Sequence, residues 1–370
     1  MEFRELLNTP GPVLLDGGMG TMLQARGLSI GEWPELAALE HPDWLEDIHR
    51  AYVEAGAQIL CANTFGANRE KLGRTGRTVE EVVPPSVEIA RRAARGRALV
   101  ALDVGPTGQL LEPTGTLRFE EAVDIFAQTV RAGVQAGADL ILIETMTDLQ
   151  EARAALLAAK ENSSLPVIVT MTYEERGRTF LGCDPASAAL TLEGMGADAI
   201  GVNCSLGPRE MPPLVRELTR WSTLPIAIKP NAGLPDPGGA GYDITAEEFA
   251  GSMAELTGLG VKLYGGCCGT TAEHVAALRA AVEAVDFSAF VPPRRDPDVI
   301  PCASEKEARF ITPDIDVGET IECTSDLLED ILEAEENAPQ GALKIAIYDE
   351  DDLYTFAENQ YAVKDALCLW

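Results

Sequence analysis

The chain has 370 residues, of which 46% are hydrophobic, and this size suits one large α/β domain with an appendage. Its formal net charge of −30 excludes nucleic acid and anionic membrane surfaces as partners, because both would repel it. The start of the chain has no apolar signal sequence, and no run approaches the roughly 20 apolar residues of a membrane span, so we expect a cytoplasmic protein whose cysteines are reduced.

Short apolar runs alternate with longer helical stretches along most of the chain. Continuous apolar strands are typical of a parallel sheet that is covered on both faces. Eight βα units in roughly 285 residues predict a (β/α)8 TIM barrel, in which functional residues follow the strands at one rim. An open doubly wound sheet is the alternative, but polar residues and cysteines follow almost every strand, which favours the barrel. The predicted strands are residues 12–15, 57–61, 98–102, 139–143, 166–170, 199–202, 225–228 and 261–264.

Two carboxylates follow predicted strands in the first half of the barrel. Asp16 follows the first strand and Glu144 the fourth, and either could bind an ammonium group at the rim. Gly17 and Gly18 leave backbone N–H groups free to bind a carboxylate. Together these groups predict an amino-acid site. The alternatives are an Asx turn or helix cap for Asp16, and a helix end or a basic partner for Glu144.

Three cysteines follow two later strands. Cys204 ends the sixth strand, and the adjacent pair Cys267 and Cys268 lies in a glycine-rich turn after the eighth. Adjacent cysteines bridge each other poorly but can both face one metal. Because a barrel brings these strand ends to one rim, we predict a zinc site with three thiolate ligands and an open fourth position. The alternatives are a fourth cysteine, Cys61 or Cys183, that closes a structural site, or cysteines that serve only as buried apolar side chains.

Three thiolates determine the chemistry that such a zinc site supports. They leave Zn²⁺ with a net charge of −1, which makes it a weak Lewis acid for water but lets it bind and deprotonate a fourth thiol. Beside an amino-acid site, this predicts alkyl transfer to an amino thiol. No general base is then needed, so no catalytic residue beyond the metal site is expected, and His41, His49 and His274 are assigned surface or capping roles.

The composition changes after the predicted barrel, which we place at residues 1–290. Residues 291–310 are rich in proline and predict a linker. From residue 314 to the end, 16 acidic residues face two lysines, for a net charge of −14. Strand-like and helical runs within residues 311–370 predict a small acidic α/β appendage, or alternatively the start of a further domain that is cut short.

Five motifs together resemble the homocysteine S-methyltransferase family, and most closely the homocysteine-binding module of cobalamin-dependent methionine synthase. The likeness covers residues 1 to about 290. It implies zinc on Cys204, Cys267 and Cys268, and homocysteine held by Asp16, the Gly17–Gly18 backbone and Glu144. It also implies that Asn231 approaches the metal when substrate is absent. The motifs are residues 16–21, 63–66, 103–108, 201–205 and 265–270.

The methyl donor is not identified by these motifs. Residues 310–370 show no recognisable folate module, and the chain has no Asp-x-His-x-x-Gly signature of corrinoid binding. The resemblance therefore implies that methylcobalamin, carried by a partner protein or by further domains, supplies the methyl group. A small donor such as S-methylmethionine or betaine is one alternative. Another thiol or a selenol as acceptor, and a non-catalytic zinc scaffold that docks partners through its acidic segment, are the others.

Overall fold

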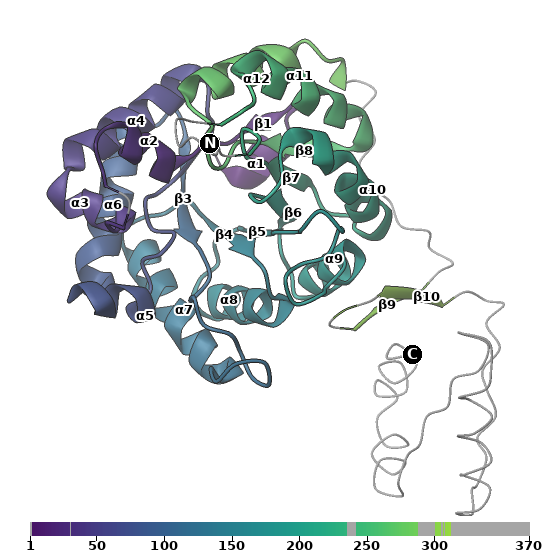
Figure 1. Cartoon of the computed structure of the whole chain (residues 1–370), viewed down its shortest axis with the longest axis horizontal. Coiled ribbons are helices and arrows are strands. Elements are labelled where there is room, and N and C mark those ends of the chain that lie inside the picture. Colours follow the sequence, from purple (N-terminus) through teal and green to yellow (C-terminus); the bar gives the residue numbers. More distant parts are fainter. Residues whose placement is uncertain are drawn as a thin grey trace, which may run out of the picture. The chain divides into compact units, whose positions relative to one another are not determined.

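Eight parallel strands form a barrel, as the alternation of apolar runs predicts. The computed structural model describes residues 2–29, 31–234, 242–287, 300–304, 306 and 308–311. The sheet order is β1-β8-β7-β6-β5-β4-β3-β2, and a bridge between Leu15 and Ile59 joins its two ends (Figure 1). The strands are β1 Val13–Leu14, β2 Ile59–Cys61, β3 Leu99–Val104, β4 Leu140–Met146, β5 Val167–Met171, β6 Ala199–Asn203, β7 Ile226–Lys229 and β8 Val261–Tyr264.

A ring of helices surrounds the strands in Figure 1. Several begin at a side-chain cap: Thr78 and Thr245 form capping boxes, and Asp148 and Asp184 accept from backbone N–H groups of the first turn. The helices are α1 Phe3–Asn8, α2 Met19–Ala25, α3 Ala37–Glu40, α4 Pro42–Ala55, α5 Arg69–Leu72, α6 Val79–Ala94, α7 Phe119–Gln135, α8 Leu149–Asn162, α9 Pro185–Gly194, α10 Met211–Trp221, α11 Ala246–Glu255 and α12 Ala272–Glu283.

The barrel interior is filled by apolar side chains from every strand. They form one buried cluster with Phe3 and Leu6 of α1. Small residues let some strands approach closely: a Cβ atom on Gly201 of β6 would lie 1.7 Å from the carbonyl oxygen of Ala227 in β7. The strand residues of the cluster are Val13, Leu15, Ile59, Cys61, Leu99, Ala101, Leu140, Leu142, Ile168, Ala199, Ala227 and Leu263.

The parallel register brings the carboxyl ends of the strands to one rim. Asn203 at the end of β6 pairs with Lys229 at the end of β7, and Tyr264 at the end of β8 pairs with Ile228. Cys204 directly follows Asn203, and the Gly265–Thr270 turn directly follows Tyr264. Residues that are far apart in the sequence therefore meet beside β7.

Residues 296–370 form a second unit, separate from the barrel unit of Met1–Arg295. Its described part is an antiparallel hairpin of β9 Ile300–Ala303 and β10 Ala308–Ile311, which the proline-rich composition did not predict. Cys302 is disulfide-bonded, so the expectation that all cysteines are reduced is wrong for this residue. The helices and strands predicted after residue 311 lie outside the described residues. No helix within the described ranges is long and apolar enough to cross a membrane.

Candidate metal and substrate site

The three predicted cysteine ligands meet at the rim. The Sγ atoms of Cys204, Cys267 and Cys268 all lie within 4.8 Å of one another, and those of Cys267 and Cys268 are 4.0 Å apart. Tetrahedral zinc with Zn–S bonds of about 2.3 Å requires S–S separations of roughly 3.8 Å, so the arrangement fits such an ion. We call these three side chains the cysteine tripod.

The conformation and hydrogen bonds of the backbone around the tripod fix the positions of the cysteines. Cys204 and Ser205 have left-handed φ angles of 59° and 58°, which non-glycine residues adopt only under constraint. The Cys267 N–H donates to the Pro230 carbonyl at 2.9 Å, and the Ala232 N–H donates to the Cys268 carbonyl at 2.9 Å. The loop after β7 therefore fixes the cysteine pair after β8.

The thiols of the tripod differ in pKa. The hydrogen bonds of Cys268 with Cys204 and Cys267 hold the pKa of the Cys268 thiol down to about 3. The same kind of bond raises the pKa of the Cys267 thiol well above its ordinary value. The tripod thus carries one thiolate that its neighbours stabilise, which suits capture of a cation.

The other two cysteines considered as a fourth ligand lie apart from the tripod. Cys61 Sγ accepts from Lys229 Nζ at 3.4 Å, and Cys183 Sγ donates to the Asp184 carbonyl at 3.3 Å. Neither belongs to a group of three metal-binding side chains among the residues described here. Three thiols without a fourth leave one coordination position for a ligand from outside.

Two asparagines brace the tripod. Asn231 Oδ1 accepts from the Cys268 N–H at 3.1 Å, so the structure places this predicted residue against the cysteine tripod. Asn203 belongs to the motif 201–205 but was not predicted as a site residue. It is fully buried, and its Nδ2 lies 4.0 Å from Cys267 Sγ. Its Oδ1 accepts from the Thr145 N–H and from Thr170 Oγ1, each at 2.8 Å, which ties β4 and β5 to the site. Its position directly before Cys204 was the available signal.

Asp16 lies in the barrel mouth and is 1% exposed. Its Oδ2 accepts from the Cys61 N–H at 2.7 Å, across to β2, rather than forming an Asx turn. Its Oδ1 has no hydrogen-bond partner among the described residues. Burial raises the pKa of Asp16 to about 6. The free oxygen is an acceptor that an incoming N–H group could use.

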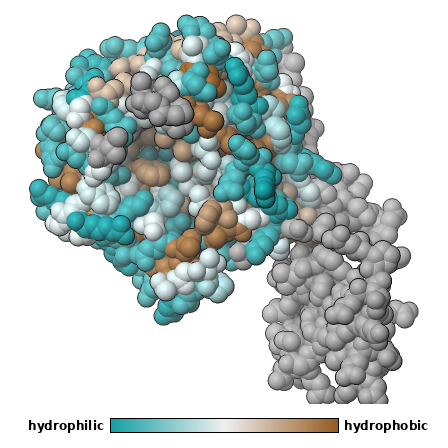
Figure 2. All heavy atoms as spheres, in the orientation of Figure 1, coloured by the Kyte–Doolittle hydropathy of each residue, from teal (hydrophilic) through white to brown (hydrophobic). Residues whose placement is uncertain are grey.

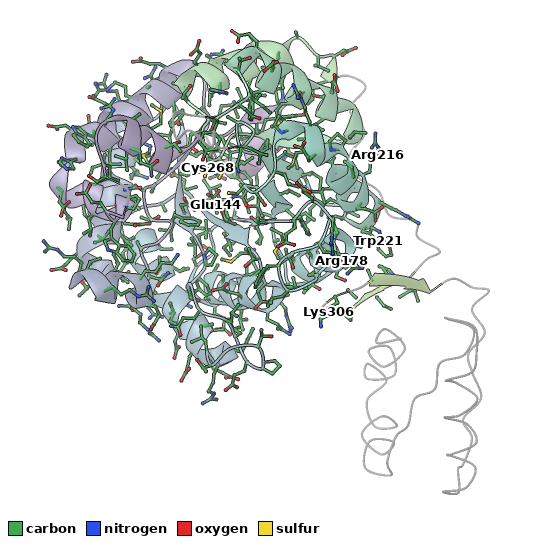
Figure 3. The ribbon with its side chains drawn as sticks, in the orientation of Figure 1. Glu144, Arg178, Arg216, Trp221, Cys268 and Lys306 are labelled. Carbon is green, nitrogen blue, oxygen red and sulfur yellow. The ribbon has the colours of Figure 1, made fainter. Side chains whose placement is uncertain are left out.

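Glu144 has a basic partner, which is one of the two alternatives to substrate binding that its sequence position allowed. Its Oε2 accepts from Lys229 Nζ at 2.5 Å, and both side chains are almost fully buried. Burial alone would lower the pKa of Lys229, but the Cys61, Glu144 and Asp16 side chains around it raise that pKa well above its ordinary value. Figure 3 shows Glu144 and Cys268 near the middle of the barrel.

Asp103, at the end of β3, completes a group that we call the acid cluster: Asp16, Asp103, Glu144 and Lys229. Burial raises the pKa of Asp103 well above its ordinary value, and its Oδ1 has no partner within the described part of the chain. Neither Asp103 nor Lys229 was among the site residues predicted from the sequence. Both follow or end predicted strands, and that position was the signal that marked them.

The glycine turn after β1 packs on the cysteine turn after β8. Gly18 N–H donates to Thr270 Oγ1 at 3.0 Å, so this amide is not free as expected. The Gly17 N–H has no partner in the described ranges. A Cβ atom on Gly18 would lie 2.5 Å from the Cys267 carbonyl oxygen, which explains why glycine is needed there.

The three histidines lie outside the tripod. His41 stacks on Trp44, and His274 bonds to Thr271 in the cap of α12. His49 is fully buried in α4, so the expectation of a surface or capping role is wrong for it. Burial lowers the pKa of His49 to about 4.

The chain is similar in sequence to known proteins. The family profile described as homocysteine S-methyltransferase matches residues 13–282. Methionine synthases of Mycobacterium leprae and Mycobacterium tuberculosis are 35% and 36% identical over 289 and 290 residues. Each match covers 72% of this chain and 24% of the relative, so the chain spans about a quarter of the length of these proteins.

Solved structures show the same relationship. The metallated form of the homocysteine methyltransferase MmuM from Escherichia coli has a TM-score of 0.66 and 25% identity, and covers 75% of this chain and 98% of that one. The apo form of the same protein has a TM-score of 0.61 and 26% identity over the same shares of the two chains.

Proposed function

The chain belongs to the homocysteine S-methyltransferase family, and from this premise we propose that it activates homocysteine at a zinc ion held by Cys204, Cys267 and Cys268 for methyl transfer that yields methionine. The observation that carries the proposal is the tripod itself, three sulfurs within 4.8 Å of one another beside a buried acid cluster.

The tripod prepares the thiol acceptor. The chemistry that zinc supplies when bound by three thiolates is to lower the pKa of a fourth thiol, so that the acceptor sulfur is a thiolate at neutral pH. Asn203 and Asn231 keep the cysteine turns in place by the hydrogen bonds described above. No side chain is then required to remove the thiol proton.

The acid cluster orients the amino-acid part of homocysteine. In this proposal, Asp16 Oδ1 and Glu144 accept hydrogen bonds from the substrate ammonium. The unpartnered oxygen of Asp16 and its depth in the mouth support this role. In this proposal, the Gly17 N–H, which has no partner in the described ranges, donates to the substrate carboxylate. The two ends of the amino acid thereby direct its thiol toward the tripod.

The donor in this proposal is a methylcorrinoid, carried by a partner protein or another domain. Four large apolar side chains of the described barrel are exposed: Leu39 in α3, and Leu110, Phe180 and Leu234 in the segments that follow β3, β5 and β7. Phe180 and Leu234 are 64% and 60% exposed. Figure 2 shows a hollow near the middle of the barrel face seen there. The methionine synthases that the chain resembles are about four times as long as the matched region, which supports a donor carried outside that region.

A small donor, S-methylmethionine or betaine, is the second candidate, because the acceptor site makes no demand on the size of the donor. We also propose a cytoplasmic location, since three free thiols at one site are typical of a reducing compartment, although the disulfide of Cys302 in the second unit is unusual there.

The test combines metal analysis with a donor screen. We expect one zinc per chain and formation of methionine from homocysteine and methylcobalamin. Cys204→Ala should lose both metal and activity, whereas Cys183→Ala, which removes a buried thiol outside the tripod, should keep both. Turnover with S-methylmethionine or betaine but not methylcobalamin would change the donor.

X-ray absorption distinguishes the proposed enzyme from a non-catalytic zinc scaffold. For the enzyme, we expect the spectrum to show a sulfur ligand gained by zinc when homocysteine is added. Zinc-replete protein whose spectrum does not change and that makes no methionine with any donor would favour the scaffold instead.

A further inference from the structure

Lys229 crosses the barrel mouth. It is the last residue of β7, and its side chain is 3% exposed. Its Nζ contacts Glu144 Oε2 of β4 at 2.5 Å and Cys61 Sγ of β2 at 3.4 Å. The ammonium group is therefore fixed from two sides, inside the site proposed for substrate.

The stability of the fold does not explain this lysine. Burying an ion pair costs desolvation that its attraction often fails to recover, so apolar side chains of similar volume serve a core as well or better. A buried pair in the mouth of a binding site thus points to a role in binding.

The acid cluster has more carboxyl groups than Lys229 contacts. Three carboxyl groups face one lysine, and Asp16 Oδ1 and Asp103 Oδ1 have no hydrogen-bond partner among the described residues although both side chains are buried. Buried acceptors without donors are costly. Because Lys229 directs its Nζ at Glu144 and Cys61, the two free oxygens remain for a second N–H donor.

A substrate ammonium has the charge and the donors that this arrangement lacks. It carries one positive charge and three N–H groups, and Asp16, Asp103 and Glu144 all lie close enough to influence one another's protonation. Glu144 can accept from both ammonium groups, because a carboxylate has about four lone-pair sites.

We propose that Lys229 is a positioning residue for substrate selection: it holds the Glu144 carboxylate so that Glu144, Asp16 and Asp103 together receive the α-ammonium of an amino thiol. This inference rests on the proposed function and adds Lys229 and Asp103 to it. Its consequence is selectivity, since a thiol without the amino group leaves the free oxygens of Asp16 and Asp103 unsatisfied.

The experiment compares two thiols on zinc-replete full-length protein. Calorimetry measures the Kd of homocysteine and of 4-sulfanylbutanoate, which is homocysteine without its amino group. We expect wild type to prefer homocysteine. Lys229→Met, which keeps the length of the side chain but removes the charge, should weaken homocysteine about tenfold or more and leave the amine-free thiol almost unchanged. Lys229→Arg should restore most of the preference.

Further measurements separate positioning from folding. Lys229→Met should keep one zinc per chain, and in turnover its effect should fall on KM rather than kcat. Lys160→Met is the matched control. It breaks the ion pair between Lys160 and Asp198, the residue just before β6, and should leave both Kd values unchanged.

Several outcomes would overturn the proposal. If wild type prefers homocysteine and Lys229→Met keeps that preference, whether or not both thiols bind more weakly, the role of Lys229 alone is overturned. The same follows if Lys229→Met binds homocysteine more tightly. Wild type that binds homocysteine selectively but makes no methionine would overturn the proposed reaction and leave the role of Lys229 standing. Wild type that binds neither thiol would overturn both.

Discussion

At the scale of single residues, left-handed backbone gathers around the site. Thr145 lies near the end of β4, and Cys204 and Ser205 directly follow β6. Their φ angles are 61°, 59° and 58°. Asn203 connects them, since its Nδ2 donates to Thr145 Oγ1 at 2.7 Å and it directly precedes Cys204. Strain of this kind persists only where the surroundings hold it.

Asn203→Ala should therefore destabilise both the fold and the metal site. It leaves buried partners in Thr145 and Thr170 unsatisfied, and we expect a loss of about 2–4 kcal/mol in the free energy of unfolding. Urea unfolding measures this loss, and metal analysis should show weaker zinc retention. Thr170→Val, which removes only one of these bonds, is the control and should cost less. Equal losses in the two variants would mean that Asn203 does not act as a hub.

His49 should make the chain sensitive to acid. Its pKa is about 4 when folded and 6.5 when unfolded, because burial disfavours the charged ring. The unfolded chain therefore takes up a proton below pH 6.5 that the folded chain refuses, and stability is lost as the pH falls from 6.5 toward 4. At pH 5 the loss should be about 2 kcal/mol.

Comparison with His49→Leu isolates this effect. Asp16 works in the opposite direction, since its pKa is raised from 3.8 to about 6 in the folded chain, but it is present in both proteins. Urea unfolding at pH 7 and pH 5 should show wild type losing about 2 kcal/mol relative to the variant. A difference that is the same at both pH values would refute the assignment.

At the scale of elements, the close approach of β6 and β7 depends on one glycine. Gly201→Ala would push a methyl group into the Ala227 carbonyl, and no flexible side chain is there to move. We expect a loss of about 3 kcal/mol in the free energy of unfolding. Gly251→Ala in α11 is the control: nothing lies within 4 Å of the added Cβ, so it should gain about 0.5–1 kcal/mol. A stable Gly201→Ala variant would show that the two strands can separate.

The strands were predictable because a buried parallel strand is a continuous apolar run. The predicted run 261–264 is β8 as observed. The four-residue helices α3 and α5 were not predicted, because one turn is too short to show helical periodicity.

The cysteine tripod was predictable because barrel closure fixes where strand ends meet. The acid cluster was predictable only in part. The sequence marks Lys229 and Asp103 as residues at strand ends, but whether such a side chain turns inward depends on register and rotamer. The bond from the Cys61 N–H to Asp16 likewise depends on the closing contact between β1 and β2, which no local pattern encodes.

At the scale of the whole molecule, the barrel contains all the parts of the candidate site. Its strands close on one another, and the last helix α12 ends at Glu283, before the boundary at Arg295. A chain that ends at residue 295 should therefore fold, keep one zinc, and melt within about 2 °C of the full chain by calorimetry. Aggregation or loss of metal in the shortened chain would show that the barrel depends on the second unit.

The order of the three cysteines along the chain decides when the protein can acquire the proposed metal. Cys204 leaves the ribosome before Cys267 and Cys268, and at about 5–20 residues per second the interval is roughly 3–12 s. The three sulfurs meet only after β8 has paired with β1 and β7. On the proposed function, metal loading would then be a maturation step that follows closure of the barrel. Cells short of zinc would accumulate folded protein without metal, which a later supply of zinc would activate without new synthesis.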